Sequence, residues 1–171
     1  VTTELIKAIA NKFGKTCEDV LTGFKYIADK IRNWEVDPHG KQFLFGGEES
    51  YGYLLGTFVR DKDAVVSSAL ICEVALREKR KGRTLVDKLH QLYKTYGIHL
   101  EDLVNIKFPE SKEGAEQREA LMRKLREESP REIAGIAVKS LEDYKTSTIT
   151  ILKSGEKKTL DFPVSNVLRY W

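Results

Sequence analysis

Apolar residues recur at helical spacing through most of the first half of the chain. The spacing predicts helices over about 2–13, 24–34, 64–80 and 84–96, and a glycine follows closely after most of them. The first half of the 64–80 segment is apolar on nearly every side, so we expect that helix to be deeply buried.

A different pattern begins near Gly97. Short apolar runs then predict strands at about 103–108, 133–138, 147–152 and 158–162, with one highly charged helix over 111–128. We therefore predict an α/β protein of two units, 1–98 and 99–171. The chain begins with Val1 rather than methionine and closes in an apolar run at Trp171, so we expect it to be cut at both ends.

The stretch Phe43–Tyr53 carries the strongest chemical signal. An apolar run at 42–45 predicts a buried strand, and Gly46-Gly47 predicts a turn after it. Glu48 and Ser50 are two positions apart, so they project to the same side of an extended loop, while Glu49 points away. A carboxylate beside a hydroxyl suits the adjacent hydroxyls of a sugar. The plainer alternative is a strand that leaves its sheet through a glycine turn, followed by solvated acids.

One further position, Thr22-Gly23, is a candidate for anion binding. Thr22-Gly23, at the start of the 24–34 helix, offers a hydroxyl and free backbone N–H groups to a phosphate. A plain helix N-cap explains Thr22 equally simply. Arg60 and Lys62 lie just before the 64–80 helix.

Composition narrows the function classes. A net charge of +3 is too small to indicate nucleic-acid or membrane binding, and no signal peptide or membrane-spanning segment is visible. The two cysteines have no metal-type spacing and are typical of reduced thiols in the cytoplasm, and the three histidines stand isolated. The basic segment 77–83 leaves open a stand-alone RNA- or protein-binding module. A cationic last helical turn explains it as well, and no aromatic residues are interleaved for stacking.

Several segments together resemble one enzyme family, the α-D-phosphohexomutases, and most closely its bacterial phosphoglucomutase/phosphomannomutase branch. The resemblance implies that 1–98 is domain 3 of a four-domain enzyme, an α/β/α sandwich-like domain with a small mixed sheet that lacks its first strand. It implies that 99–171 is an incomplete α+β domain 4. The segments that carry the resemblance, in chain order, are 1–10, 21–30, Gly47-Glu-Glu-Ser-Tyr-Gly52, Arg60-Asp-Lys-Asp63 and Pro163-Val-Ser-Asn-Val-Leu168.

The family moves a phosphoryl group between C1 and C6 of a hexose through a bisphosphorylated intermediate. The resemblance implies that Glu48 and Ser50 hold the 3- and 4-hydroxyls, which stay accessible in both orientations of that intermediate. Thr22 matches a ligand-contacting threonine of the family. Lys62 matches a lysine near the reacting phosphate, with an acid/base part less certain, and Arg60 belongs to the same segment. Glucose and mannose, which differ at C2, both fit this prediction.

Other parts of the family's machinery have no counterpart in the chain. Nothing resembles the phosphoserine loop, the acidic metal loop or the last phosphate-clamping loop. We therefore predict no metal site and no catalytic nucleophile here, and no mutase activity for the fragment alone. Mg²⁺, hexose 1,6-bisphosphate and the missing domains 1 and 2 would belong to the full-length parent. A phosphate sensor that uses Thr22 and Lys62 without chemistry remains a third hypothesis.

Overall fold

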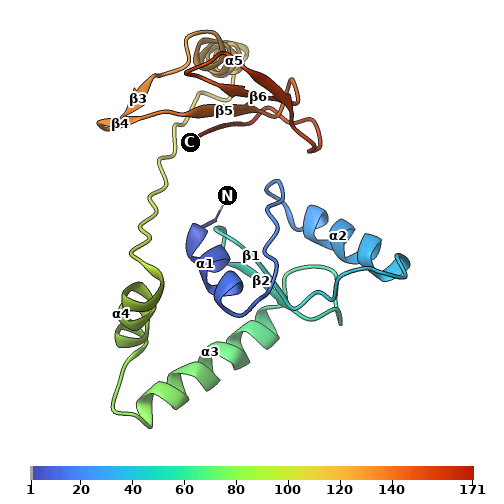
Figure 1. Ribbon diagram of the computed structural model, residues 1–171, viewed down its shortest axis with the longest axis vertical. Helices are drawn as coiled ribbons and strands as arrows, with labels where there is room; N and C mark the ends of the chain where they lie inside the picture. Colours follow the sequence, from blue (N-terminus) through green and yellow to red (C-terminus); the bar gives the residue numbers. More distant parts are fainter. Residues whose placement is uncertain (1) are drawn as a thin grey trace. The chain divides into compact units, whose positions relative to one another are not determined.

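The structure, a computed structural model, describes residues 2–171 as two compact units (Figure 1). The first unit ends at Asp102 and the second is Leu103–Trp171, whereas the sequence predicted a boundary after Ile98. Both units combine helices with antiparallel strand pairs, which confirms the α/β class.

The helices of the first unit lie where apolar spacing predicted them. They are α1 (Glu4–Lys12), α2 (Phe24–Val36), α3 (Ala64–Lys79) and α4 (Leu85–Tyr96). Local capping sets several of the starts, because a side-chain oxygen accepts an N–H group of the first turn. The N-cap residues that do so are Thr3 for α1, Asp63 for α3 and Thr84 for α4.

A two-stranded hairpin, β1 (Phe45–Glu48) and β2 (Gly52–Leu55), packs against α2. The predicted buried strand at 42–45 is wrong in register, because the strand begins only at Phe45 and Gly46 and Gly47 lie inside it. The chain turns at residues 49–51, after the predicted Gly46-Gly47, and Tyr51 in this turn has a φ of 60°. The core of this unit consists of Phe24, Ile27, Ile31 and Leu54, with Val20, Phe43 and Val59 packed against it.

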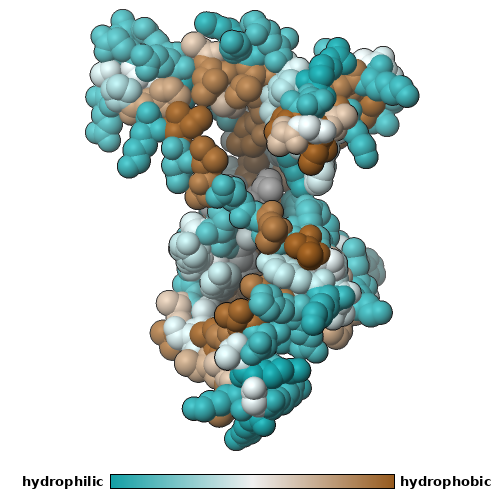
Figure 2. All heavy atoms as spheres, turned by 90° about the vertical axis from the view of Figure 1, so that its left-hand side faces the viewer, coloured by the Kyte–Doolittle hydropathy of each residue, from teal (hydrophilic) through white to brown (hydrophobic). Residues whose placement is uncertain are grey.

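Helix α3 is not deeply buried, contrary to the prediction from its apolar sequence. Of its sixteen residues only Glu78 is buried, and Val65 is 81% exposed. Among the described residues, β2 and α4 pack on α3 and leave other sides open to solvent. Apolar side chains therefore show at the surface (brown in Figure 2), and those of α3 include Val65, Leu70, Ile71 and Leu76.

The second unit places one helix, α5 (Lys112–Glu127), with a four-stranded antiparallel sheet. The sheet order is β7 (Lys157–Thr159), β6 (Thr148–Ile151), β5 (Ser140–Asp143) and β8 (Leu168–Tyr170). Apolar runs predicted β6, β7 and α5 but missed β5 and β8. Leu141, Tyr144 and Leu160 form the buried apolar positions of this unit.

Two predicted strands of this unit are wrong. Residues 103–108 form no strand and belong to none of the sheets of the described residues. The predicted strand 133–138 is instead a short hairpin of β3 (Glu132–Ile133) and β4 (Ile136–Ala137). Ala134 and Gly135 turn it, with φ values of 51° and 80°.

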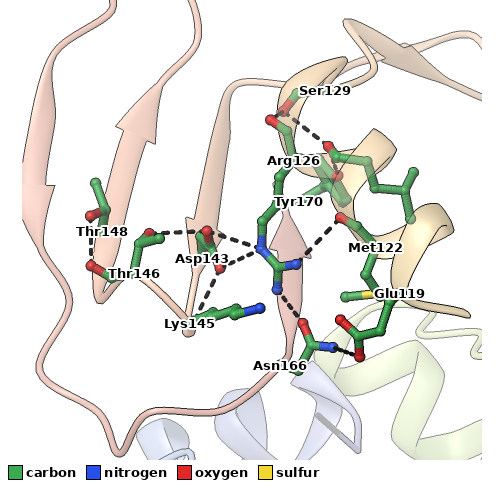
Figure 3. Close-up of polar contacts among 11 residues, drawn as sticks. Glu119, Met122, Arg126, Ser129, Asp143, Lys145, Thr146, Thr148, Asn166 and Tyr170 are labelled. Carbon is green, nitrogen blue, oxygen red and sulfur yellow. Dashed lines mark hydrogen bonds and ion pairs between the residues drawn. The ribbon is translucent and has the colours of Figure 1, made fainter. Parts of the chain in front are cut away.

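A polar network fixes α5 to the sheet (Figure 3). Arg126 of α5 donates from Nε to both carboxylate oxygens of Asp143, at 3.1 and 3.2 Å. Asp143 is 8% exposed and also accepts from the Thr146 hydroxyl and the Lys145 N–H group, each at 3.0 Å. Arg126 donates further to the side chain of Asn166. Burial raises the pKa of Asp143, but these hydrogen bonds and the Arg126 charge outweigh it and hold the pKa below its ordinary value.

We expect Asp143→Ala to lower the free energy of unfolding by about 3 kcal/mol, because it leaves Arg126, whose side chain is only 15% exposed, without its carboxylate partner. Chemical denaturation at pH 7 measures the loss. The matched control is Lys124→Ala, which removes an exposed 4.0 Å ion pair with Glu128. That control should cost about 1 kcal/mol or less.

The Asp143→Ala variant can also be compared with wild type at acid pH. The folded-state pKa of Asp143 lies below the unfolded one, so its contribution is present above about pH 3.9 and is lost as the pH falls through the folded value. The gap between wild type and Asp143→Ala should therefore narrow below about pH 4. A gap that stays constant from pH 7 to pH 2.5 contradicts the assignment.

Candidate functional site

Glu48 stands at the end of β1 with its carboxylate against the start of α2. The side chain is buried, and its Oε1 accepts the backbone N–H group of Gly23 at 2.6 Å. Gly23 is the N-cap of α2 and has a φ of 124°, a conformation that favours glycine. A carboxylate at this helix end also complements the helix dipole. The hairpin and the helix are thus joined by one charge-assisted hydrogen bond.

Ser50 and Lys62 complete the cluster on the other carboxylate oxygen. The Ser50 hydroxyl donates to Oε2 of Glu48 at 3.3 Å, and Lys62 Nζ lies 3.1 Å from the same oxygen. Lys62 Nζ also donates to Ser50 Oγ at 3.3 Å. We call Gly23, Glu48, Ser50 and Lys62 the Glu48 cluster. The three side chains lie within hydrogen-bonding distance of one another.

The electrostatics keep the Glu48 carboxylate ionised. Burial raises the pKa of Glu48, but the hydrogen bonds from Lys62 and the Gly23 N–H group, the Lys62 charge and the Ser50 hydroxyl outweigh it. The net effect is a pKa below the ordinary value for glutamate. The lysine end of the cluster stays partly open, since the Lys62 side chain is 43% exposed. Its Nζ lies 5.9 Å from the ring centroid of Phe24, within cation–π range.

This arrangement can bind a pair of neighbouring hydroxyl groups. An ionised carboxylate accepts a hydrogen bond from one hydroxyl, while a serine hydroxyl and an ammonium group donate to the oxygen of the next. Glu48 and Ser50 lie on one side of the hairpin end. Glu49 is exposed, and its Oε2 accepts the Thr2 hydroxyl at 3.3 Å instead.

Thr22 does not cap α2, contrary to the simpler interpretation of the sequence. The N-cap is Gly23, no side chain caps this helix, and Thr22 is exposed beside it. The Gly23 N–H group, which the sequence suggested was free for a phosphate, is bound by Glu48. A carboxylate thus occupies the place expected for an external anion.

Arg60 lies outside the Glu48 cluster. One of its terminal nitrogens donates to both carboxylate oxygens of Glu35, at 2.6 and 2.7 Å, and the other donates to the carbonyl of Thr57 at 2.5 Å. The structure therefore brings together Glu48, Ser50 and Lys62 of the predicted site residues. Thr22 is adjacent to the cluster in sequence, and Arg60 is engaged elsewhere.

Sequence reasoning missed two contributors to this geometry. Gly23 was noted for its N–H group but not as the partner of Glu48, which lies 25 positions away. Gly52 was not singled out, although it pairs directly with Glu48 across the hairpin. The contact of Gly23 depends on how the hairpin packs on α2, and the pairing of Gly52 depends on the register of the hairpin, which the sequence prediction placed wrongly.

The basic segment 77–83 is partly neutralised by its own buried acid. Glu78 is 2% exposed and pairs with Arg83 at 2.5 Å and with Lys81 at 3.4 Å. Burial raises the pKa of Glu78, but these two partners outweigh it and lower the pKa. This leaves Arg77, Lys79 and Arg80 as the remaining cations, a smaller charge than the sequence suggests for a nucleic-acid surface.

The structure offers few other sites. Within residues 2–171, no group of three or more His, Cys, Asp and Glu side chains is placed to hold a metal ion. No helix in the same range is long and apolar enough to cross a membrane. Cys17 and Cys72 are free thiols.

The fold and the cluster together define an α/β domain in which a carboxylate, a hydroxyl and an ammonium group meet at the end of a hairpin. Residues 1–96 match the family model described as phosphoglucomutase/phosphomannomutase, alpha/beta/alpha domain III. The chain therefore belongs to the phosphoglucomutase/phosphomannomutase family.

Two similar relatives are the phosphoglucomutases of Staphylococcus aureus strains MRSA252 and USA300. Each is 43% identical over 169 residues, which is 99% of this chain and 30% of the relative. The chain thus spans less than a third of the length of these proteins. No solved structure matches it significantly.

We expect Lys62→Met to raise the pKa of Glu48, because the buried carboxylate then loses its strongest compensating partner. An NMR titration that follows the Glu48 side-chain carboxyl carbon measures the change. Lys30→Met is the matched control, since Lys30 pairs with Glu18 at 3.3 Å. A Glu48 titration that is identical in wild type and Lys62→Met contradicts the role given to this ion pair.

Proposed function

We propose that this chain is the sugar-recognising portion of a phosphoglucomutase. The full-length enzyme would interconvert hexose 1-phosphate and hexose 6-phosphate through a bisphosphorylated intermediate. What supports the proposal most is the Glu48 cluster, in which an ionised carboxylate, a hydroxyl and an ammonium group lie within 3.3 Å of one another. Membership of the family supplies the reaction.

Oε2 of Glu48 accepts a hydrogen bond from one sugar hydroxyl, and Ser50 or Lys62 donates to the oxygen of its neighbour. The 3- and 4-hydroxyls suit this role, because they are accessible whichever end of the bisphosphate faces the reacting serine of the larger enzyme. Hydrogen bonds to charged groups contribute about 1.5–3 kcal/mol each, which orients a sugar and still lets it leave and turn over.

The other residues of the proposed binding site are Lys62, Thr22 and Arg60. Lys62, with a side chain that is 43% exposed, contacts a substrate phosphate, and the proposal also gives it an acid/base part. Thr22 is exposed beside Gly23 and can contact substrate without displacing the Glu48 bond. Arg60 reaches substrate only if its ion pair with Glu35 opens.

Mg²⁺ and hexose 1,6-bisphosphate enter the proposal only through the full-length enzyme. The described residues contain no carboxylate group arranged as a metal site, so they do not fit Mg²⁺. No step assigned to this chain runs through a metal ion. Its part is to bind and orient the sugar, while missing domains supply the phosphoryl chemistry.

Residues 1–171 expressed alone should show no mutase activity, because no segment resembles the family's phosphoserine or metal loop. A coupled assay for glucose 6-phosphate formed from glucose 1-phosphate tests this, with the full-length enzyme as positive control. Turnover by the purified fragment above the no-enzyme blank contradicts the prediction.

In the full-length enzyme, Glu48→Ala should reduce kcat/KM by about a hundredfold or more, through lost charged hydrogen bonds and lost sugar orientation. Steady-state kinetics with glucose 1-phosphate measure the effect. Glu49→Ala is the matched control, because the neighbouring carboxylate is exposed and outside the cluster, and it should stay within a few fold of wild type. Near-normal kinetics for Glu48→Ala refute the sugar-binding role.

A further inference from the structure

Lys62 reaches Glu48 by lying across a glycine. Gly52 pairs with Glu48 in the β1–β2 ladder and is buried. A Cβ atom placed on Gly52 would lie 2.7 Å from Cγ of Lys62, and closer still to Cδ and Cε. Real Cβ atoms essentially never come within 3.0 Å of another heavy atom in this way. The alkyl stem of Lys62 therefore fills the space that any side chain at position 52 would need.

The backbone at position 52 does not itself require glycine. Gly52 lies outside the positive-φ region, whereas Gly23 and Gly56 have φ values of 124° and 67°. An L-residue can adopt the Gly52 conformation without strain. The three atoms nearest to such a Cβ all belong to Lys62, so the space that its stem takes up constrains this position.

The backbone next to Lys62 is held by two hydrogen bonds of Asp63, which limit how far it can move away from a new side chain. The Asp63 N–H group donates to the carbonyl of Tyr53 at 2.8 Å, which ties the segment to β2. The Asp63 side chain also caps α3 by accepting the Val66 N–H group at 3.0 Å. With the backbone fixed, the flexible lysine side chain is the part that must move.

We propose that Gly52 is a positioning residue for Lys62. By leaving its side-chain space empty, it lets the lysine stem lie against the hairpin and delivers Nζ between Oε2 of Glu48 and Oγ of Ser50. The inference deepens the proposed function and rests on it, since it concerns the same sugar-binding cluster. Gly52 itself touches neither sugar nor phosphate in this account and acts through Lys62.

A double-mutant cycle in the full-length enzyme tests the proposal, with Gly52→Ala, Lys62→Ala and the double variant. Gly52→Ala should move Nζ off Glu48 in a crystal structure and reduce kcat/KM by about tenfold or more, since a misplaced group costs that much. Once Lys62 is shortened to alanine, no stem remains to collide. In the Lys62→Ala background, Gly52→Ala should therefore change kcat/KM by less than about twofold. This difference from its effect in the wild type would show that positions 52 and 62 are strongly coupled.

Stability separates positioning from misfolding. Gly52→Ala should lower the denaturation midpoint no more than Lys62→Ala does, because both variants leave the buried Glu48 without its ion pair and the backbone at position 52 is compatible with alanine. Glu48 should titrate at a higher pH in Gly52→Ala, as in Lys62→Met. A crystal structure of Gly52→Ala with Nζ still on Glu48, or multiplicative effects of the two substitutions on kcat/KM, overturns the proposal.

The same experiment distinguishes this inference from the proposed function. If Lys62 leaves Glu48 in Gly52→Ala while kcat/KM stays normal, the positioning geometry holds and the substrate role of Lys62 is refuted. If Lys62→Ala and Gly52→Ala both lower kcat/KM, and the double variant is no worse than Lys62→Ala alone, the positioning role of Gly52 and the substrate role of Lys62 are both supported.

Discussion

The hydrogen bond from the Gly23 N–H group to Glu48 is the contact on which the candidate site depends. It joins the N-terminus of α2 to the end of β1, two segments that are 25 positions apart in the sequence. The apolar core directly behind it, with Phe24 and Ile27 of α2 against Leu54 of β2, holds the two segments at this distance. A buried carboxylate would be costly without such partners. The site therefore follows from the packing of the hairpin on the helix.

Features set by near neighbours could be predicted from the sequence. The helices have local start signals, such as the capping box in which Thr84 and Asp87 satisfy each other's backbone N–H groups. The alternation that separates Glu48 from Glu49 is also local. From these signals the sequence predicted the long helices and, within the Glu48 cluster, the side chains of Glu48 and Ser50. Lys62 was predicted from the family resemblance.

Features that depend on contacts between residues far apart in the sequence could not be predicted from the sequence. A Cβ atom on Gly46 would lie 3.1 Å from Phe43 and 3.3 Å from Ile27, so a glycine that suggested a turn instead permits close packing in a strand. Helix α3 is apolar yet largely exposed, and the apolar run at 103–108 is not a strand, because burial and strand pairing depend on which segments pack nearby. Arg60 and Lys62 are two positions apart, yet one pairs with Glu35 and the other with Glu48. Which acid each cation meets depends on tertiary structure.

The composition of the cluster also decides which ligand it favours. Glu48 already occupies the helix N–H group where an external phosphate was expected, and its negative charge repels a second anion at that place. A neutral hydroxyl pair has no such penalty, because it can exchange hydrogen bonds with Ser50 and Lys62 while the carboxylate keeps its bond to Gly23. The carboxylate of Glu48 is therefore better suited to sugar hydroxyls than to a phosphate group. Any contact with phosphate is left to the exposed side of Lys62.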